Sequence, residues 1–378
     1  MTETMDPLLR RLSQFAAFRA VPPDALQASL PLWKVEQLKR GKQLWKQGRP
    51  AESLAFVAAG KFSVRVNGVE ISEVHAPELI GESAIFLSGS TRTASLEATE
   101  PAQVVVLTTE GLRRLRAEAS PVYTHLLEHA LSTVVRRSHA LDRQISQVRQ
   151  GNFAAPPVRE PAGVLTRLWQ RLRPQAEPAL PGCPPLDELL VRQPGLADTD
   201  PALRAALVRA FTARSFRRGE VLVKEDTVDA RAFVLAAGTV DALRIVEERG
   251  AALLLARFEP GSMFGLSALV EDGPRTGSVV ATSDGWSYHI HRDTHGALPD
   301  PVRVVWMEAM LAVLSAQNHR ASLTLQMAIQ AFATHDPDSM PSVILDPQLG
   351  SAWGSLAGSR PDDAVARLRV HQPARRRG

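Results

Sequence analysis

Two stretches of the chain, far apart in the sequence, share one pattern, and this internal repeat limits the folds that the chain can adopt. Residues 80–99 read IGESAIFLSGSTRTASLEAT, and residues 264–282 read FGLSALVEDGPRTGSVVAT. Each stretch has a Gly, a short turn, an Arg ten or eleven residues later and a strand-like segment that ends in Ala-Thr. Because self-similarity at a fixed spacing marks a repeated structural unit, the sequence predicts two copies of one domain.

The repeat extends well beyond this motif. Gly41 and Gly219 lie 178 positions apart in matching RG segments, whereas Arg92 and Arg275 lie 183 apart. A few extra residues in the second copy, at 244–258, account for this drift. We expect a hairpin there, because hairpin tips tolerate insertions.

Each copy has the sequence pattern of a small antiparallel barrel. Short apolar stretches alternate with Gly, Asn-Gly or Pro, as expected for short strands joined by tight turns. Residues 6–18 carry an apolar stripe at helical spacing before the first barrel, and a long helix is expected at 121–148 after it. The predicted fold class is therefore mainly β with flanking helices (α+β), with two barrels in tandem.

Composition changes divide the chain into four parts. We predict a first domain at 1–149, a Pro-rich linker at 150–185 with a short amphipathic helix, a second domain at 186–332 and a disordered basic tail at 333–378.

The charge and motif content exclude several functions. The net charge is +4, but the six Arg and two Asp that follow residue 359 account for all of it, which leaves a neutral body without a nucleic-acid footprint. Past residue 331, repeated prolines leave no room for a helix-turn-helix, so direct DNA reading is not expected. The single Cys183 excludes an internal disulfide.

Other classes lack their sequence signals. We find no Walker loop, nucleophile elbow or Gly-rich kinase loop, and no third ligand accompanies His289 and His291. We therefore expect neither an enzyme nor a metal or cofactor site. No segment is apolar enough to span a membrane and the first residues do not form a signal peptide, which predicts a cytoplasmic protein without membrane contact.

The repeated motif itself has the chemistry of an anion site. A glycine at the end of a strand, followed by a short helical turn, presents main-chain N–H groups to an anion, and an Arg such as Arg92 can return to the same point. Such a site suits a phosphate. Glu82, directly after the glycine, would repel that phosphate unless it accepts hydrogen bonds from hydroxyls beside it, as a ribose provides. Phosphate with a sugar hydroxyl indicates a nucleotide.

These stretches resemble the phosphate-binding cassette of the cyclic-nucleotide-binding domain family, of the catabolite activator protein and protein kinase A regulatory subunit type. The resemblance covers roughly 8–148 and 186–331 and implies two jelly-roll barrels. In the family the Glu holds the ribose 2'-hydroxyl and the Arg clamps the cyclic phosphate. The binding residues so implied are Gly81, Glu82, Ser83, Ala84, Arg92 and Thr93, and the implied regulatory ligand is cAMP or cGMP, with cAMP favoured.

The second copy departs from the family pattern. A possible second site is formed by Gly265, Ser267, Ala268, Arg275 and Thr276, but Leu266 replaces the ribose-binding Glu. A ribose hydroxyl left unpaired by Leu266 would cost about 1–3 kcal/mol, so we expect this copy to be degenerate. Glu271 or Asp272 could serve Arg275 as a partner.

The family commonly takes a cap for the base from the long helix. The first copy's helix offers Ser132, Thr133, Ser138 and His139, and spacing does not choose among them.

Both long helices carry a second signal. The positions Leu127, Leu131, Val134, Ser138, Leu141, Ile145 and Val148 follow 4,3 spacing, as do Met307, Leu311, Leu314, Asn318, Ala321, Leu325, Ala328 and Phe332. Each is typical of a coiled-coil seam with one polar interruption, although a stripe packed on its own barrel would look similar. We predict that the helices pair inside one chain, as an internal pseudo-dimer rather than a homodimer.

The sequence therefore predicts a non-enzymatic, cyclic-nucleotide-responsive regulatory protein that signals to an unidentified protein partner. Two alternatives remain open: a scaffold whose domains no longer bind nucleotide, and a DNA-associated regulator that acts through the basic tail.

Overall fold

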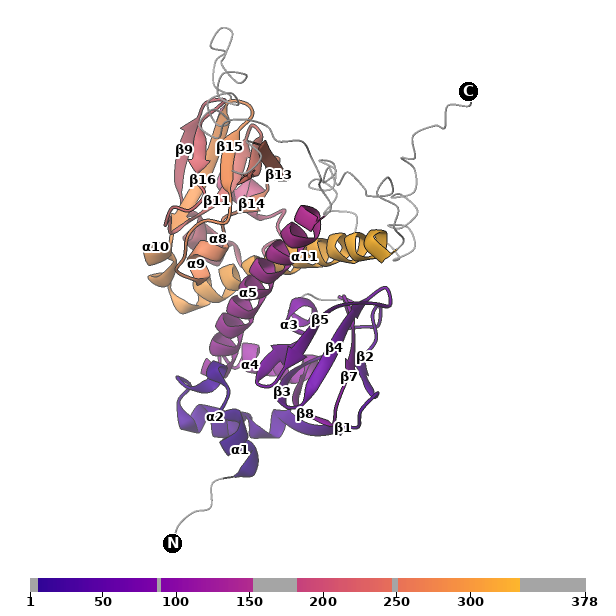
Figure 1. The fold of residues 1–378 in the computed structure, drawn as a ribbon. Coiled ribbons are helices and arrows are strands. Elements are labelled where there is room, and N and C mark those ends of the chain that lie inside the picture. The colour runs from indigo at the N-terminus through magenta and orange to yellow at the C-terminus, as the bar shows by residue number, and fades with distance from the viewer. Residues whose placement is uncertain (1–5, 87–89, 152–181, 247–250, 334–378) are drawn as a thin grey trace.

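The computed structural model describes residues 6–86, 90–151, 182–246 and 251–333, and it contains two β-rich domains with two long helices between them (Figure 1). We name these domain 1 and domain 2 in chain order. The predicted linker helix and the tail from residue 334 onwards lie outside the described residues.

Domain 1 consists of two four-stranded antiparallel sheets. The first has the order β1-β8-β3-β6 and comprises Trp33–Leu38, Ala102–Thr108, Ser53–Ala59 and Glu78–Ile80. The second has the order β2-β7-β4-β5 and comprises Gln43–Trp45, Ser95–Ala98, Lys61–Val66 and Val69–His75. Strand β3 is buried on both faces: Phe56 packs with the helices and Val57 with the second sheet. Its continuous apolar sequence follows from this double burial.

Domain 2 repeats this topology strand for strand. Its first sheet has the order β9-β16-β11-β14 and comprises Thr212–Phe216, Gly285–His291, Arg231–Ala237 and Met263–Phe264. Its second has the order β10-β15-β12-β13 and comprises Val221–Val223, Ser278–Ala281, Val240–Val246 and Ala251–Phe258. The predicted mainly β fold class with flanking helices is confirmed. The extra residues of the second copy lie in the β12–β13 hairpin, as predicted.

Helices flank each barrel. Domain 1 has α1 (Pro7–Leu12), η1 (Ala16–Phe18), α2 (Pro23–Ser29), η2 (Leu30–Leu32), α3 (Glu82–Ile85), α4 (Thr109–Ala117) and α5 (Pro121–Gly151). Domain 2 has α7 (Leu186–Leu190), α8 (Pro201–Val208), α9 (Ser267–Val270), α10 (Arg292–Gly296) and α11 (Asp300–Ala333). The expected single helix at 6–18 is wrong, because α1 ends at Leu12 with Ser13 as its C-cap and the chain resumes as η1. Its apolar residues Leu12, Phe15 and Phe18 are nevertheless buried.

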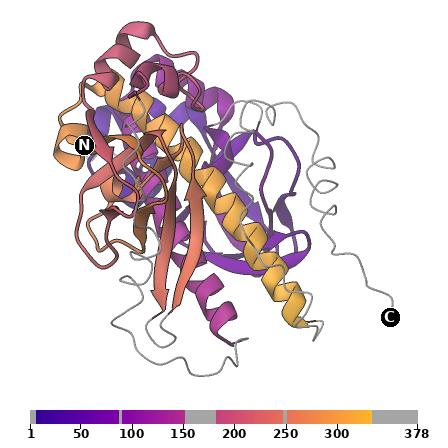
Figure 2. The ribbon, with the colours of Figure 1, turned by 90° about the horizontal axis from the view of Figure 1, so that it is seen from above.

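The helices α5 and α11 pack against each other between the two barrels (Figures 1 and 2). Their apolar seam positions, such as Leu131 and Leu311, belong to one core cluster that joins both domains. Where each seam has its polar residue, Ser138 donates a hydrogen bond to the Asn318 side chain, and Asn318 Nδ2 donates to the carbonyl of Val134 at 2.8 Å. The predicted pairing of the two helices within one chain is thus observed.

Candidate functional site

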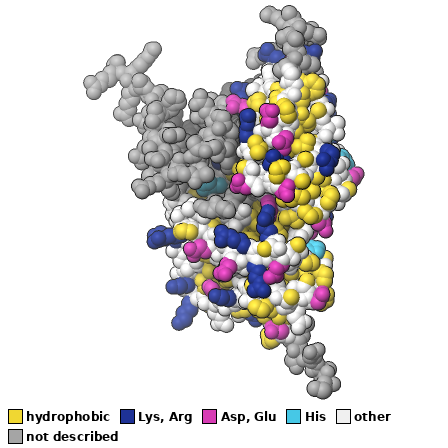
Figure 3. Space-filling model, turned by 180° about the vertical axis from the view of Figure 1, so that it is seen from behind, with side chains coloured by type: hydrophobic (Ala, Val, Ile, Leu, Met, Phe, Trp, Pro, Cys, Tyr) yellow, Lys and Arg dark blue, Asp and Glu magenta, His cyan; other side chains and the backbone are white. Residues whose placement is uncertain are grey.

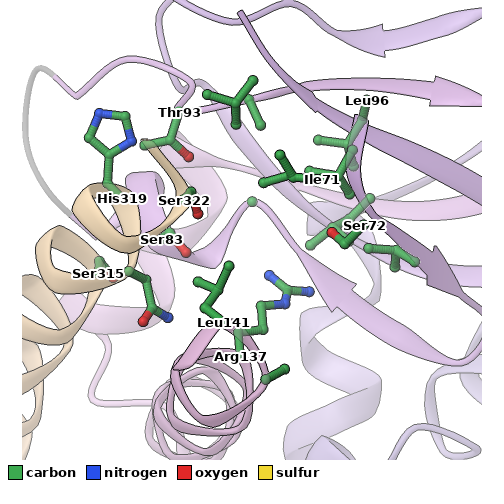
Figure 4. Close-up of a pocket in the computed structure, with 18 of the residues that line it drawn as sticks. Ile71, Ser72, Ser83, Thr93, Leu96, Arg137, Leu141, Ser315, His319 and Ser322 are labelled. Atoms are coloured by element: carbon green, nitrogen blue, oxygen red, sulfur yellow. The ribbon is translucent and has the colours of Figure 1, made fainter. Parts of the chain in front are cut away.

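A cavity of about 360 Å³ lies where the domain 1 barrel, α5 and α11 meet (Figure 4). The barrel lines it with Gly81, Ser83, Ala84, Arg92 and Thr93, and α5 contributes Arg137, Leu141 and Gln144. The remaining wall comes from α11 of domain 2, through Ser315, Asn318, His319 and Ser322. The cavity is therefore completed by both domains, although the sequence motif that predicted it lies in one.

The turn that begins at Gly81 requires a glycine for two reasons. Its φ of 81° lies in the left-handed region that residues with a Cβ rarely adopt. A Cβ at this position would also lie 2.7 Å from Nη1 of Arg92 and 2.7 Å from the Trp45 ring. The glycine thus lets the main chain approach the guanidinium closely at the edge of the cavity.

Arg92 is a buried charge whose hydrogen bonding is incomplete. Its Nη2 donates to the carbonyl of Ser53 at 2.6 Å, and its guanidinium lies over the Trp45 ring at 3.6 Å from the centroid. Within the described part of the chain, its Nε and Nη1 have no hydrogen-bond partner. Burial lowers the pKa of Arg92 to about 10, although the negative charges of Glu82 and Glu52 raise it in part. The group therefore stays cationic at neutral pH and retains donors for an anion.

Glu82 is engaged by a residue that the sequence analysis did not single out. Its Oε1 accepts from Arg137 Nη1 at 2.5 Å and from Ser83 Oγ at 2.9 Å, while its buried Oε2 has no partner among the described residues. Arg137 also donates from Nη2 to Glu78 Oε1 at 2.8 Å and to the carbonyl of Leu79 at 2.7 Å. Arg137 lines the cavity and Glu82 does not.

Two polar groups of the cavity wall on α11 also lack partners among the described residues. Among the described residues, Ser315 Oγ and His319 Nδ1 are buried without a hydrogen-bond partner. Burial, assisted by the charge of Arg320, lowers the pKa of His319, so its imidazole is neutral at pH 7. In Figure 4, Ser315, His319 and Ser322 extend from one helix along the side of the cavity.

The residues expected to cap a base do not line this cavity. None of Ser132, Thr133, Ser138 and His139 contributes to its wall. Ser138 donates its hydrogen bond to Asn318, and Thr133 Oγ1 accepts a hydrogen bond from Arg136 at 3.1 Å. The heptad pattern was the signal that could have pointed to α11 instead, because it brings that helix alongside α5.

The corresponding arginine of domain 2, Arg275, is 7% exposed and lies next to Gly265. Arg275 Nη1 donates to the carbonyl of Gly265 at 3.2 Å, and Nη2 donates to the carbonyl of Arg231. Leu266, in place of a carboxylate, is buried in the apolar core. Ser267 and Ala268 lie in α9, and the carbonyl of Thr276 accepts from Arg244 at 3.1 Å.

The acidic partner of Arg275 is not one of those expected. Asp229 Oδ1 lies 3.6 Å from its Nη2. Asp272 pairs with Arg292, and Glu271 accepts from Arg292 through its main-chain carbonyl. The expectation for Glu271 or Asp272 was wrong because the loop that carries them is held by α10.

Comparison with known proteins gives one clear match by sequence. The model of the cyclic nucleotide-binding domain matches residues 35–119 and 213–298, which are the two barrels. No curated protein matches the chain.

Several solved structures are similar. The regulatory domain of Toxoplasma gondii PKA, crystallised with cAMP, is 16% identical, with 79% of this chain and 93% of that chain covered and a TM-score of 0.29. A regulatory subunit of a cAMP-independent protein kinase A from Trypanosoma brucei is 14% identical, covering 79% and 86%, with a TM-score of 0.28. A putative cyclic nucleotide-binding protein from Geobacter metallireducens is 18% identical, covering 34% and 95%, with a TM-score of 0.31. At these TM-scores the superpositions support no conclusion about ligand or partner.

Proposed function

The chain carries two tandem domains of the cyclic nucleotide-binding family, and we propose that it is a regulatory protein that binds a cyclic nucleotide, cAMP or cGMP, in domain 1 only. The ligand acts as a regulatory signal rather than as a cofactor. The observation that carries the proposal is the unpartnered edge of Arg92, a buried cation beside a cavity of about 360 Å³. That volume lies in the range that small-molecule ligands occupy.

The proposed pose follows from the chemistry of the wall. The cyclic phosphate meets Arg92 Nε and Nη1, close to the main chain at Gly81 and to Ser83. A ribose hydroxyl donates to Glu82 Oε2, the carboxylate oxygen that Arg137 and Ser83 leave unpaired, and this requires the buried side chain of Glu82 to turn towards the cavity that it does not line in this structure. Ala84 and Thr93 complete this end of the cavity.

The base then lies against α11. Ser315 and His319 provide partners for its polar edge, because both carry buried polar atoms without partners among the described residues. Domain 2 thus serves the ligand of domain 1 by supplying a wall of the cavity. A ligand held in this way contacts both domains and the α5–α11 pair. Its binding can therefore alter how the two domains are arranged.

The output of the protein is part of the proposal as well. The matched family model describes a ligand-binding domain. We therefore propose that the signal passes to a protein partner in the cytoplasm, whose binding depends on how the two domains are arranged. Among the described residues, no helix is long and apolar enough to span a bilayer.

One observation favours the scaffold alternative. Arg137 already neutralises Glu82, so the carboxylate has a partner without any nucleotide. In that case neither domain binds a ligand, and the fold serves only as an interaction surface.

Calorimetry of the full chain with cAMP and with cGMP decides between these two functions. We expect binding of at least one nucleotide, its loss in Arg92→Ala, and little change in Arg275→Ala, which removes the corresponding cation of domain 2. Circular dichroism of both variants checks that they are folded. A wild-type protein that binds neither nucleotide at millimolar concentration would overturn the sensor function and leave the scaffold. Equal losses from the two substitutions would contradict the assignment of binding to domain 1.

A further inference from the structure

We propose that domain 2 retains an oxyanion site that is filled from within by the carboxylate of Asp229, so that an internal contact closes this domain to phosphate. This goes beyond the absence of a ribose-binding Glu at Leu266, because it concerns the phosphate end of the site. It also does not depend on nucleotide binding in domain 1.

The two arginines are held in the same way. Arg92 Nη2 donates to the carbonyl of Ser53, and Arg275 Nη2 donates to the carbonyl of Arg231, 178 positions later. Gly265 repeats Gly81, with a φ of 71° and an ideal Cβ position 3.0 Å from Nη1 of Arg275. The arginine and the glycine therefore keep a similar arrangement in both copies, except that Arg275 Nη1 also donates to the carbonyl of Gly265, a hydrogen bond that Arg92 does not make with Gly81.

Several positions near this arginine differ in charge between the copies; Glu52 and Ser53 of domain 1, for example, correspond to Ala230 and Arg231. Asp229 corresponds by the same spacing to Ala51 of domain 1. The isolated bridges beside these positions, Pro50 with Thr91 and Val228 with Pro274, confirm the register. Domain 2 therefore brings a carboxylate to a place where domain 1 has a methyl group.

The Asp229 carboxylate contacts both Arg231 and Arg275. Its Oδ1 accepts from Arg231 Nε at 2.9 Å and from the Arg231 main-chain N–H at 3.1 Å, and its Oδ2 accepts from Arg231 Nη2 at 3.0 Å. The same Oδ1 lies 3.6 Å from Arg275 Nη2. One carboxylate therefore lies between two guanidinium groups, which is an arrangement that a phosphate also favours.

The charges agree with this geometry. Burial opposes the ionised form of Asp229, but hydrogen bonds from Arg231 and the charge of Arg275 outweigh it, and its pKa lies below the ordinary value. In domain 1 the nearest acidic groups, Glu82 and Glu52, make no hydrogen bond or ion pair with Arg92. Arg92 of domain 1 thus makes no ion pair with a carboxylate, whereas Arg275 of domain 2 shares the carboxylate of Asp229 with Arg231.

This arrangement has a consequence for engineering the second site. Leu266→Glu alone would add a second carboxylate to a site where Arg275 already faces the carboxylate of Asp229. Removal of Asp229 would instead leave Arg231 and Arg275 close together as two like charges, which an external oxyanion can compensate. The site should then accept inorganic phosphate.

The test measures the thermal unfolding of the full chain with increasing inorganic phosphate at constant ionic strength. We expect Asp229→Ala to unfold at a lower temperature than the wild type and to regain about 2–4 °C in Tm with phosphate, beyond any gain of the wild type. Because the wild type has the same domain 1, its gain is subtracted, and failure of nucleotide binding there would not affect the result.

The matched control is Asp241→Ala. Asp241 makes two hydrogen bonds with Arg257 in the same domain, at 2.7 Å and 2.9 Å, without contact to Arg275. Phosphate should not rescue this variant, nor the double variant Asp229→Ala with Arg275→Leu. If Asp229→Ala does not fold, Asp229→Asn, which keeps the size of the side chain but not its charge, provides the same test. An equal phosphate gain in the wild type, Asp241→Ala and the Asp229 variant would overturn the proposal.

Discussion

Nη1 of Arg137 lies 2.5 Å from Oε1 of Glu82, although the two residues are 55 positions apart. Arg137 belongs to α5, which packs against the other domain, whereas Glu82 begins α3 at the edge of the cavity. The ion pair therefore joins the candidate ribose site to the helix pair between the two domains. Burial opposes the charge of Arg137, but Glu82 and Glu78 outweigh it and raise its pKa.

The first prediction tests this ion pair. Arg137→Ala leaves the fully buried side chain of Glu82 without its cation. We expect this to lower the free energy of unfolding by about 2–3 kcal/mol. The loss is smaller than for an ion pair with both side chains buried, because Arg137 itself is partly exposed. Urea unfolding of the full chain measures this loss. Arg136→Ala, which removes the neighbouring exposed arginine, should change stability by no more than about 0.5 kcal/mol. Equal effects of the two substitutions would show that the ion pair contributes nothing specific.

The second prediction concerns the base end of the cavity. Ser315 and Ser287 both have a buried Oγ without a partner among the described residues, but only Ser315 lines the cavity. Ser315→Ala and Ser287→Ala should therefore each leave stability unchanged or slightly raised, since an unsatisfied hydroxyl is removed. In calorimetry, Ser315→Ala alone should weaken nucleotide binding, by about threefold to tenfold. An unchanged affinity would exclude Ser315 as a contact of the base.

The third prediction is that the full chain is a monomer in solution. The apolar seam positions from Leu127 to Leu141 and from Met307 to Leu325 are buried or, at Ala321, partly buried within one chain, so this part of the seam is not available to a second copy. Light scattering should give a mass near 41.1 kDa. A dimer that Leu131→Glu with Leu141→Glu converts to a monomer would place the seam between chains instead.

The fourth prediction is a loss of stability in mild acid that originates at His295. Burial and the charge of Arg303 lower the pKa of His295 to about 4, below the ordinary value of 6.5. Below pH 6.5 the unfolded chain therefore takes up a proton that the folded chain does not, and stability that is complete above pH 6.5 is lost as the pH falls towards 4. Between pH 8 and pH 5.5 this loss is about 1 kcal/mol.

Urea unfolding at these two pH values measures the effect. His295→Gln should remove about 1 kcal/mol of the acid loss, whereas His75→Gln, at a side chain that is 52% exposed, should leave the loss as it is in the wild type. The same loss in all three proteins would show that His295 is not its source.

Much of the fold could be predicted from the sequence because its determinants are local and occur twice. Turn glycines and apolar strands such as 53–59 mark the barrel, and the repeat shows that two barrels share one topology. The heptad positions predicted the α5–α11 pair, since a continuous apolar stripe must be covered. The break at Ser13 was missed because the stripe of residues 6–18 continues across it at helical spacing.

Only some of the residues of the candidate site could be predicted from the sequence. The sequence predicted Gly81, Ser83 and Arg92 together, and these residues do meet at the cavity. Arg137 and Asp229 were not predicted, because each acts on a residue far away in sequence and nothing in its own neighbourhood distinguishes it from other charged residues. Such partnerships depend on helix rotation and strand register, which become visible only in three dimensions.

The pairing of α5 with α11 inside one chain also affects how this protein can change by mutation. In a symmetric dimer each substitution appears at both sites at once, so an improvement of one site at the expense of the other is impossible. Here the two halves are inherited as separate stretches of one gene, and a change such as Leu266 or Asp229 alters one half alone. One half can therefore specialise in recognising a ligand while the other specialises in enclosing it.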